Sequence, residues 1–369
     1  MDYVEMNIYS EKMVDMVENP PDRVHTISHT DLDGYGCEAL LKIAFDDSLS
    51  HTWERTNPGK SLLESLEKAL KMFDEAGLDL LMITDLNLTQ EAYDLLSNSD
   101  HLDKVVWIDH HQTTNVDCDP YWWEENTCIL SSYDGEQTCA ASLLWGLCRD
   151  RVDITFYIGD YVTEMIRMYD TYSFKTDIET SPIFFAELPG RAYHPAYLLN
   201  TAYHLGDAGR TFIDSLYAIY DCHTKNIENF IIYGLDVLYD GIYRSLVLNA
   251  LKQDVDYVAK KLEKSFEQSV TINGHKYKFR AVFAEKLMND VGHEIMSVYP
   301  DLDFIAIIGD NAISFRSERD DIDLSQIAKA FNPLGGGHKK AAGAGITPEL
   351  RKVMVDTTIT KALELAAAE

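Results

Sequence analysis

VHTISHTDLDGYGCEALL, residues 24–41, begins as an apolar, strand-like run and continues into a helical pattern. Three potential metal ligands lie between the two at alternate positions, namely His29, Asp31 and Asp33. Side chains at alternate positions of an extended segment point to one side, so we expect these three to converge on a metal ion. Gly34 and Gly36 follow them and are expected to let the backbone turn sharply.

A calcium-binding EF-hand loop is one alternative for this D-x-D-G stretch. Such a loop needs a bidentate Glu at its twelfth position, which is Lys42 if the loop starts at Asp31 and Leu40 if it starts at His29. The sequence therefore argues against this kind of calcium loop. For the cluster alone, a turn of solvated acids with a structural histidine stays open as the second interpretation.

Two more apolar runs of strand length follow, LLMIT at residues 80–84 and VVWID at 105–109, and helical patterns separate the three runs. Strands that alternate with helices predict a mostly parallel α/β sheet with right-handed crossovers. Ligands of open α/β sheets bind at the carboxyl ends of the strands. The second and third runs end in further polar candidates, namely Asp85, Asp109, His110 and His111.

Asp170 follows a helical stretch and would be read, taken alone, as a turn acid. Together, the candidates offer oxygen and nitrogen ligands without thiolate, a set that suits manganese or magnesium better than structural zinc. Two divalent ions, about 3.5–4 Å apart and joined by a shared carboxylate, can activate water for in-line displacement at phosphorus. The residues therefore predict a phosphoesterase that uses two divalent cations.

The composition limits the possible partners. The chain has 369 residues, 46% of them hydrophobic, which is enough for two or three domains. Its net charge of −29 lacks the basic footprint of a protein that binds long nucleic acid, so a bound phosphate must be held locally. No stretch is long and apolar enough for a membrane helix, and the first 20 residues do not resemble a signal peptide. The six cysteines contain no C-x-x-C pair and are expected to be reduced thiols in a cytoplasmic protein.

The pattern changes twice along the chain. Residues 1–190 carry the metal motifs, after an acidic arm at 1–22 that we expect to be helical, and residues 191–265 read as a helical connector. From 266 to 369, short strands and an Asn273-Gly274 turn predict a smaller C-terminal α/β domain.

A glycine-rich loop, NPLGGGHKKAAGAG at residues 332–345, stands out in this last part. Consecutive glycines expose backbone N–H groups, and the basic side chains beside them add donors, so we expect a local anion cradle at Gly335, Gly336, Gly337, His338 and Lys339. The loop is not a P-loop, because G-x-x-x-x-G-K-[ST] is not met. The alternative is a plain flexible turn after Pro333.

The order of these motifs, from the HTDLDG stretch through the Asp-His-His triplet to the GGGHKKAAG loop, resembles the DHH phosphoesterase family with its DHH-associated C-terminal domain. The similarity is greatest to the bacterial nano-RNase (oligoribonuclease) branch. The resemblance implies a parallel-sheet DHH domain, a helical connector, a smaller C-terminal domain and an active site in the cleft between the domains.

The resemblance also implies a role for each candidate. One manganese ion would be held by His29, Asp31 and Asp85, and the second by Asp33, Asp85, His110 and Asp170. Asp109 would orient a ligand, and His111 would sit beside the scissile phosphate. The substrate's terminal nucleotide would be bound by Ser314, Arg316, Gly335, Gly336, Gly337, His338 and Lys339.

The expected activity is manganese-dependent hydrolysis of short RNA or DNA oligonucleotides to 5′-mononucleotides by water that two metal ions activate, and dephosphorylation of adenosine 3′,5′-bisphosphate. A phosphodiesterase for cyclic or linear signalling dinucleotides, a RecJ-like exonuclease and a non-catalytic scaffold are the alternatives. We expect a monomer or homodimer that does not bind membranes. The Tyr121-Trp122-Trp123 stretch would either stack nucleobases or serve as packing.

Overall fold

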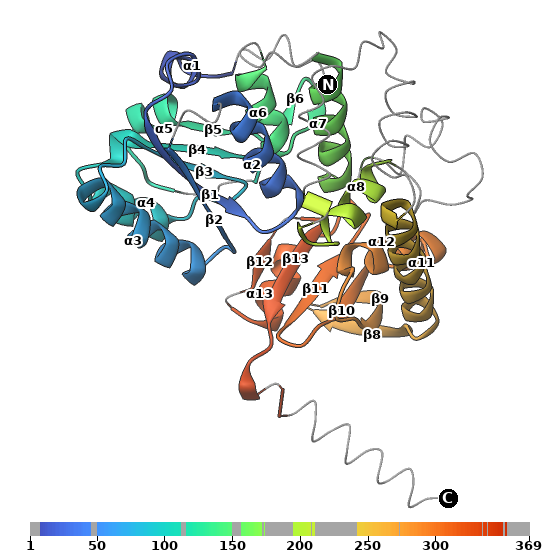
Figure 1. The fold of residues 1–369 in the computed structure, drawn as a ribbon. Helices are drawn as coiled ribbons and strands as arrows, with labels where there is room; N and C mark the ends of the chain where they lie inside the picture. The colour runs from blue at the N-terminus through green and yellow to red at the C-terminus, as the bar shows by residue number, and fades with distance from the viewer. Residues whose placement is uncertain are drawn as a thin grey trace, which may run out of the picture. The chain divides into compact units, whose positions relative to one another are not determined.

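The structure is a computed structural model that describes residues 8–45, 50–111, 116–149, 156–171, 173, 195–207, 209–210, 242–272, 274–333, 335–337, 339–349 and 351–352. The chain forms two compact units, Met1–Asn249 and Ala250–Glu369, shown in Figure 1. Their boundary falls inside the segment that the sequence predicts as a connector. The division into three parts stays a prediction.

The first unit is built on a five-stranded sheet in the order β2-β1-β3-β4-β5, in which every neighbouring pair is parallel. The strands are β1 (Arg23–His29), β2 (Ser50–Thr56), β3 (Leu80–Thr84), β4 (Val105–Asp109) and β5 (Thr127–Ile129). This confirms the predicted parallel α/β sheet. Strand β2 was not predicted, because its sequence SHTWERT has no apolar run, as suits a partly exposed strand at the edge of a sheet.

Helices cover this sheet on both sides (Figure 1). Those next to the sheet are α2 (Leu32–Phe45), α3 (Lys60–Glu75), α4 (Gln90–Ser97), α5 (Pro120–Asn126) and α6 (Ala140–Cys148). Helix α7 (Phe156–Asp170) packs on α2 and α6, and α8 (Pro195–Tyr203) packs on α7. Helices α3 and α4 bury their apolar stripes against the sheet, where Leu66 and Leu96 join Ile83 and Trp107 in one core. The same core includes Trp122, which is 4% exposed and donates its indole N–H to the Leu102 carbonyl. Trp122 therefore serves as packing.

The predicted N-terminal arm contains helix α1 (Glu11–Glu18), capped by the Ser10 hydroxyl. Met13 and Val17 are buried, and the Tyr9 hydroxyl donates to the Leu143 carbonyl at 2.5 Å. The Ser10 hydroxyl also donates to the Glu125 carbonyl, so the arm is packed onto the first unit.

The second unit contains a six-stranded sheet in the order β12-β13-β11-β10-β9-β8. Its strands are β8 (Phe266–Ile272), β9 (His275–Phe283), β10 (Phe304–Ile308), β11 (Ala312–Arg316), β12 (Gly336–Gly337) and β13 (Ala341–Gly345). Helix α13 (Leu324–Phe331) packs on one face, whereas α12 (Met288–Val298) packs with the end of α11 (Ile242–Glu263) on the other. This confirms a smaller C-terminal α/β unit.

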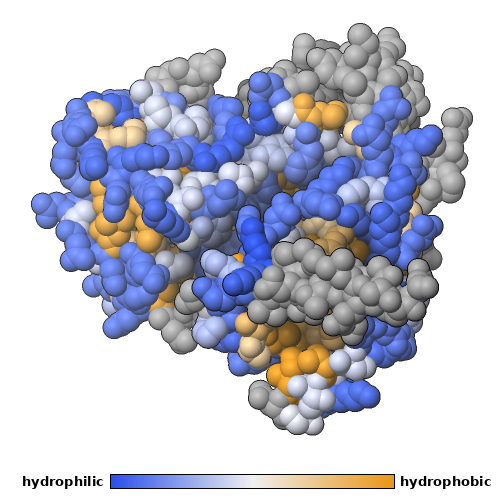
Figure 2. Space-filling model, turned by 90° about the horizontal axis from the view of Figure 1, so that it is seen from below, coloured by the Kyte–Doolittle hydropathy of each residue, from blue (hydrophilic) through white to orange (hydrophobic). Residues whose placement is uncertain are grey.

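The exposed side chains on one face of the molecule are largely polar (Figure 2). Figure 2 shows a face of the molecule that is mostly hydrophilic, with separate hydrophobic patches. Within the described residues, no helix combines the length and the apolarity that a membrane span requires.

Candidate metal centre

The first ligand group lies where β1 gives way to α2. Strand β1 ends at His29 and helix α2 begins at Leu32, so the chain does not stay extended through Asp33, and the predicted alternation along an extended segment was wrong. Asp31 instead begins the helix, because its carboxylate accepts the Gly34 N–H at 3.1 Å. Asp33 therefore lies in the first helical turn, where a negative charge is favoured.

The two glycines of this stretch have a different role from the predicted sharp turn. Both lie inside α2, and neither has a positive φ angle. A Cβ atom on Gly34 would lie 2.4 Å from the His29 carbonyl oxygen, and one on Gly36 would lie 2.7 Å from Ile166 Cδ1 of α7. The glycines therefore allow α2 to approach both the end of β1 and the helix that carries Asp170.

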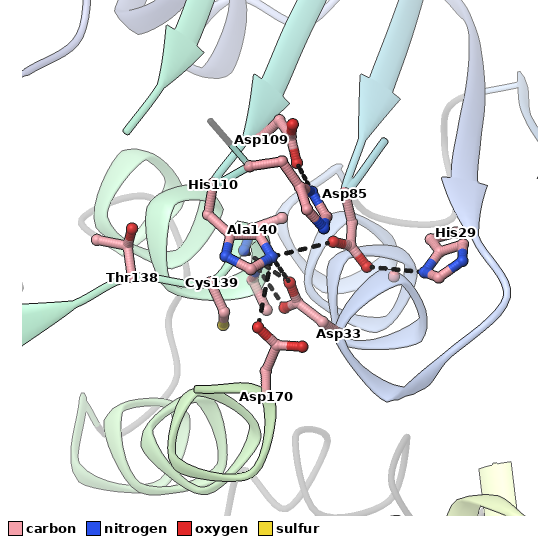
Figure 3. A network of polar contacts seen from close by, with 12 residues as sticks. His29, Asp33, Asp85, Asp109, His110, Thr138, Cys139, Ala140 and Asp170 are labelled. Atoms are coloured by element: carbon pink, nitrogen blue, oxygen red, sulfur yellow. Dashed lines mark hydrogen bonds and ion pairs between the residues drawn. The ribbon is translucent and has the colours of Figure 1, made fainter. Parts of the chain in front are cut away.

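Asp85 occupies the middle of the site. It follows β3 directly, is 2% exposed, and has a left-handed backbone with φ of 57°. Its Oδ2 lies 3.6 Å from His29 Nδ1, and its Oδ1 lies 3.5 Å from His110 Nε2 (Figure 3). Asp85 Oδ2 has no hydrogen-bond partner among the described residues although it is buried. A carboxylate in this position can be shared by two cations.

The second ligand group surrounds His110, which follows β4. Its Nε2 atom lies 3.4 Å from Asp170 Oδ2, at the end of α7, and 3.9 Å from Asp33 Oδ2 (Figure 3). This Nε2 atom is also buried without a hydrogen-bond partner among the described residues. A strand end and two helices thus bring three predicted ligands together.

His111 and Asp109 form a separate pair. His111 Nδ1 lies 2.7 Å from Asp109 Oδ1, and Asp109, the last residue of β4, is fully buried. Burial opposes the protonation of His111, but its hydrogen bond to Asp109 raises the net pKa of the imidazole above its usual value. Asp109 therefore fixes the orientation of His111 and favours its charged form.

Helix α6 holds Asp33 in a way that the sequence did not reveal. The backbone N–H groups of Ala140 and Ala141 donate to Asp33 at 2.7 and 2.8 Å, one to each carboxylate oxygen. Cys139 caps this helix, and its reciprocal contacts with Ser142 form a capping box. Because backbone donors belong to every residue type, no sequence signal identifies these two contacts.

The electrostatics of the site favour bound cations. Burial and the neighbouring Asp31 and Asp33 carboxylates raise the pKa of Asp85 well above its usual value, and burial raises the pKa of Asp170 to about 7. Burial would lower the pKa of His29, but hydrogen bonds to Asp31 and Asp85 raise it to about 10. Carboxylates gathered this closely hold protons unless another positive charge is present.

The donor atoms fit divalent metal ions. Ligand atoms lie within 4.8 Å of one another in each of three overlapping groups: His29, Asp31 and Asp85; Asp33, His110 and Asp170; and Asp85, Asp109, His110 and His111. Four buried side-chain atoms have no hydrogen-bond partner among the described residues, and three of them belong to these groups: Asp85 Oδ2, Asp109 Oδ2 and His110 Nε2. These acidic and histidine clusters could therefore hold metal ions, while the role of each ligand stays a prediction.

Comparison with known proteins agrees with this site. No protein-family model matches the chain. The chain is 28% identical over 336 residues to oligoribonuclease NrnB of Bacillus subtilis (strain 168), which covers 90% of the chain and 75% of that relative. This similarity supports the resemblance to the DHH phosphoesterase family.

Solved structures share the fold of this chain. RecJ of Thermus thermophilus in complex with Mn²⁺ matches with a TM-score of 0.54 at 15% identity, over 92% of the chain and 53% of RecJ. An exonuclease RecJ bound to manganese matches with a TM-score of 0.52 at 14% identity, over 92% of the chain and 90% of that protein. Both likenesses concern the fold alone.

The predicted substrate residues lie in the second unit. Ser314 and Gly336 both lie opposite Gly343 in β13, from the neighbouring strands β11 and β12. Arg316 is on the same strand as Ser314, and its guanidinium donates to Asn289 Oδ1 from Nη2 at 2.6 Å and from Nε at 3.0 Å. The structure therefore gathers several predicted anion contacts at one end of the sheet.

Two details correct the predicted anion cradle. The Gly335 N–H donates to the Asn332 carbonyl at 2.7 Å, so this group is used within the loop. Gly337 belongs with Gly336 to the short strand β12, which pairs with β13. The Lys339 side chain is exposed, and His338 lies outside the described residues. The sequence predicted a run of consecutive free N–H groups, and this prediction was wrong for Gly335, the first residue of the run.

Proposed function

We propose that this protein is a manganese-dependent exoribonuclease that hydrolyses oligonucleotides of about two to five nucleotides to 5′-mononucleotides. The similarity to an oligoribonuclease supports both a hydrolase of phosphodiester bonds and a short RNA substrate. The main observation is the convergence of the predicted ligands around buried Asp85 Oδ2, which has no hydrogen-bond partner among the residues that the structure describes.

The two ligand groups would each hold one divalent cation. His29 and Asp31 belong to the first, Asp33, His110 and Asp170 to the second, and Asp85 lies between them. When bound, such cations lower the pKa of water and stabilise the charge of the attacked phosphate. Manganese is supported by the ligand chemistry and by the RecJ structures that share this fold, and magnesium suits the same oxygen ligands.

His111 would act on the scissile phosphate itself. Asp109 holds His111 Nδ1, which fixes how the imidazole is presented. Since the pKa of His111 is raised, the ring carries a positive charge over more of the neutral pH range than an isolated histidine. We propose that this charge stabilises the transition state of hydrolysis, in which negative charge accumulates on the phosphate.

The second unit would bind the substrate's terminal nucleotide. Arg316 offers a planar guanidinium that Asn289 orients. Ser314, Gly336 and the exposed Lys339 are further donors of the same unit. A protein with a net charge of −29 is poorly suited to follow a long phosphate backbone, which favours a substrate with few phosphates. A substrate with few phosphates could also be adenosine 3′,5′-bisphosphate, which we propose as a second substrate. We further propose that the protein is a cytoplasmic monomer or homodimer.

Hydrolysis of end-labelled RNA tests this proposal. RNA of two, three, five and twenty-four nucleotides is incubated with manganese, magnesium or EDTA, and the products are resolved on a gel. We expect rapid, manganese-dependent loss of the short substrates and slow attack on the longest. Protein that binds manganese but cleaves no length would overturn the oligonucleotide assignment and favour a cyclic or linear signalling dinucleotide.

Two pairs of variants assign the residues. Asp85→Ala should abolish turnover because it removes the shared ligand, whereas Asp100→Ala, at an exposed acid of the same unit, should not. Arg316→Ala should chiefly raise KM, whereas Arg319→Ala, whose guanidinium pairs with Asp321 and Asp303, should leave KM unchanged. Near-normal activity of Asp85→Ala with manganese would refute the two-metal assignment.

A further inference from the structure

Helix α8 is more than the spacer that the sequence suggested. The Tyr203 hydroxyl, at the end of this helix, donates to the Thr30 carbonyl oxygen at 2.7 Å. Tyr203 is 7% exposed, so water competes little for this hydrogen bond. Thr30 is the one residue between the predicted ligands His29 and Asp31, so α8 contacts the backbone of the first ligand group.

Thr30 is also held on its other side. Its hydroxyl donates to Asn57 Oδ1 at 2.9 Å, just beyond the end of β2. One hydrogen bond therefore fixes the Thr30 carbonyl and another fixes its side chain, from two elements far apart in the sequence. The residue between two predicted ligands cannot rotate without breaking at least one of these bonds.

The orientation of this residue controls both ligands. His29 Nδ1 lies 2.7 Å from Asp31 Oδ2, so the two side chains converge on the same small volume. A rotation of the peptide planes on either side of Thr30 would move one ligand relative to the other. Removing a hydrogen bond that orients a metal ligand commonly lowers metal affinity about 10- to 100-fold.

We infer that Tyr203 is a positioning residue for the cation held by His29, Asp31 and Asp85. This inference rests on the proposed two-metal function. Tyr203 donates to the Thr30 backbone, so it would act through that carbonyl and not as a metal ligand. The helix that the sequence assigned to a connector is then part of the metal-binding apparatus.

A second tyrosine provides a matched control. Tyr35 lies in α2, and its ring centroid is 5.5 Å from that of Tyr203. Its hydroxyl also donates to a backbone carbonyl, that of Arg210 at 3.1 Å, which is not next to a predicted ligand. Y203F and Y35F therefore each remove one buried tyrosine hydroxyl, but only Y203F releases the Thr30 carbonyl.

The experiment is a titration of the metal-free full chain with Mn²⁺ by isothermal calorimetry, with free Mn²⁺ followed by electron paramagnetic resonance. Y203F should weaken one of the two binding events at least about tenfold and leave the other unchanged, because one outer hydrogen bond is lost. Y35F should bind both ions within about twofold of the wild type. Thermal unfolding of both variants measures any general loss of stability.

Equal manganese affinity in Y203F and wild type would overturn the inference. Equal weakening in both variants would overturn it as well, because the effect would then come from loosening α8 as a whole. If the wild-type chain bound no manganese, the proposed function would fail on that result, before the variants are compared.

Discussion

Asp33 and Asp85 are predicted metal ligands of the same chemical type, yet their surroundings predict opposite effects of removing the charge. Asp33 accepts two backbone N–H groups of α6, at 2.7 and 2.8 Å. Asp85 has one buried oxygen without a hydrogen-bond partner among the described residues, and other carboxylates surround it. We therefore expect Asp33→Asn to destabilise the metal-free protein and Asp85→Asn to stabilise it.

The magnitudes follow from these contacts. In Asp33→Asn, an amide keeps one acceptor and turns its own N–H groups towards a buried donor of α6. Losing one charge-assisted hydrogen bond and leaving that donor unsatisfied costs about 3 kcal/mol. In Asp85→Asn, the neutral amide relieves carboxylate repulsion and can donate to a neighbouring carboxylate, which should stabilise the fold by about 1 kcal/mol.

Tryptophan fluorescence measures the difference directly. All five tryptophans lie in the first unit, at positions 53, 107, 122, 123 and 145, so the signal follows the unit that holds the site. For a unit of this size, 1 kcal/mol shifts Tm by about 2–4 °C. In EDTA, Asp33→Asn should lower Tm by roughly 6–12 °C, and Asp85→Asn should raise it by about 2–4 °C.

Manganese should reverse the order of wild type and Asp85→Asn. A ligand at about 100 times its Kd stabilises the folded state by about 2.7 kcal/mol, and only a chain with intact ligands gains this. Wild type should then melt above Asp85→Asn. If Asp85→Asn proved less stable than wild type in EDTA, or if Asp33→Asn melted like wild type, the electrostatic reasoning would be refuted.

Three further predictions concern solution conditions. Manganese affinity should rise between about pH 6 and pH 8, because binding displaces protons from His29, with a pKa of about 10, and Asp170, with a pKa of about 7; calorimetry in two buffers measures the released protons, and an affinity independent of pH would contradict this. The free energy of unfolding of the first unit should fall by about 2 kcal/mol as the pH falls from about 6.5 towards 4. Burial lowers the pKa of His51 to about 4, so its ring stays neutral in the folded chain while the unfolded chain binds a proton. Urea unfolding of H51Q should show a smaller loss, and an unchanged pH profile would exclude His51 as the cause. KCl should raise Tm because it screens repulsion within a chain of net charge −29. Sorbitol at matched osmolality should not reproduce the full increase, and a Tm that does not change with KCl would show that this repulsion is unimportant.

The sequence predicted the strand ends well because the strands are buried. The runs LLMIT and VVWID became β3 and β4 at the same residues, and every position in them is buried. Such strands read as continuous apolar runs. Strand β2 lacks that signal because an edge strand can carry polar residues.

Other features depend on contacts between distant parts of the chain. Ala140 lies 107 residues from Asp33, and Tyr203 lies 173 residues from Thr30. The first contact uses a backbone donor and the second a backbone acceptor, so neither residue type indicates the pairing. Asp170 was identified only by its place in the order of family motifs, since an acid at the end of a helix has no signature of its own.

The left-handed backbone of Asp85 has an evolutionary consequence. Aspartate and asparagine adopt this conformation more readily than other residues with a side chain, and glycine adopts it freely. A duplicated copy of the gene could therefore exchange Asp85 for Asn or Gly, lose the carboxylate that we propose is shared by two cations, and still fold. Branched residues at this position would strain the chain. Related proteins that have become non-catalytic scaffolds should therefore often carry Asn or Gly at the position of Asp85.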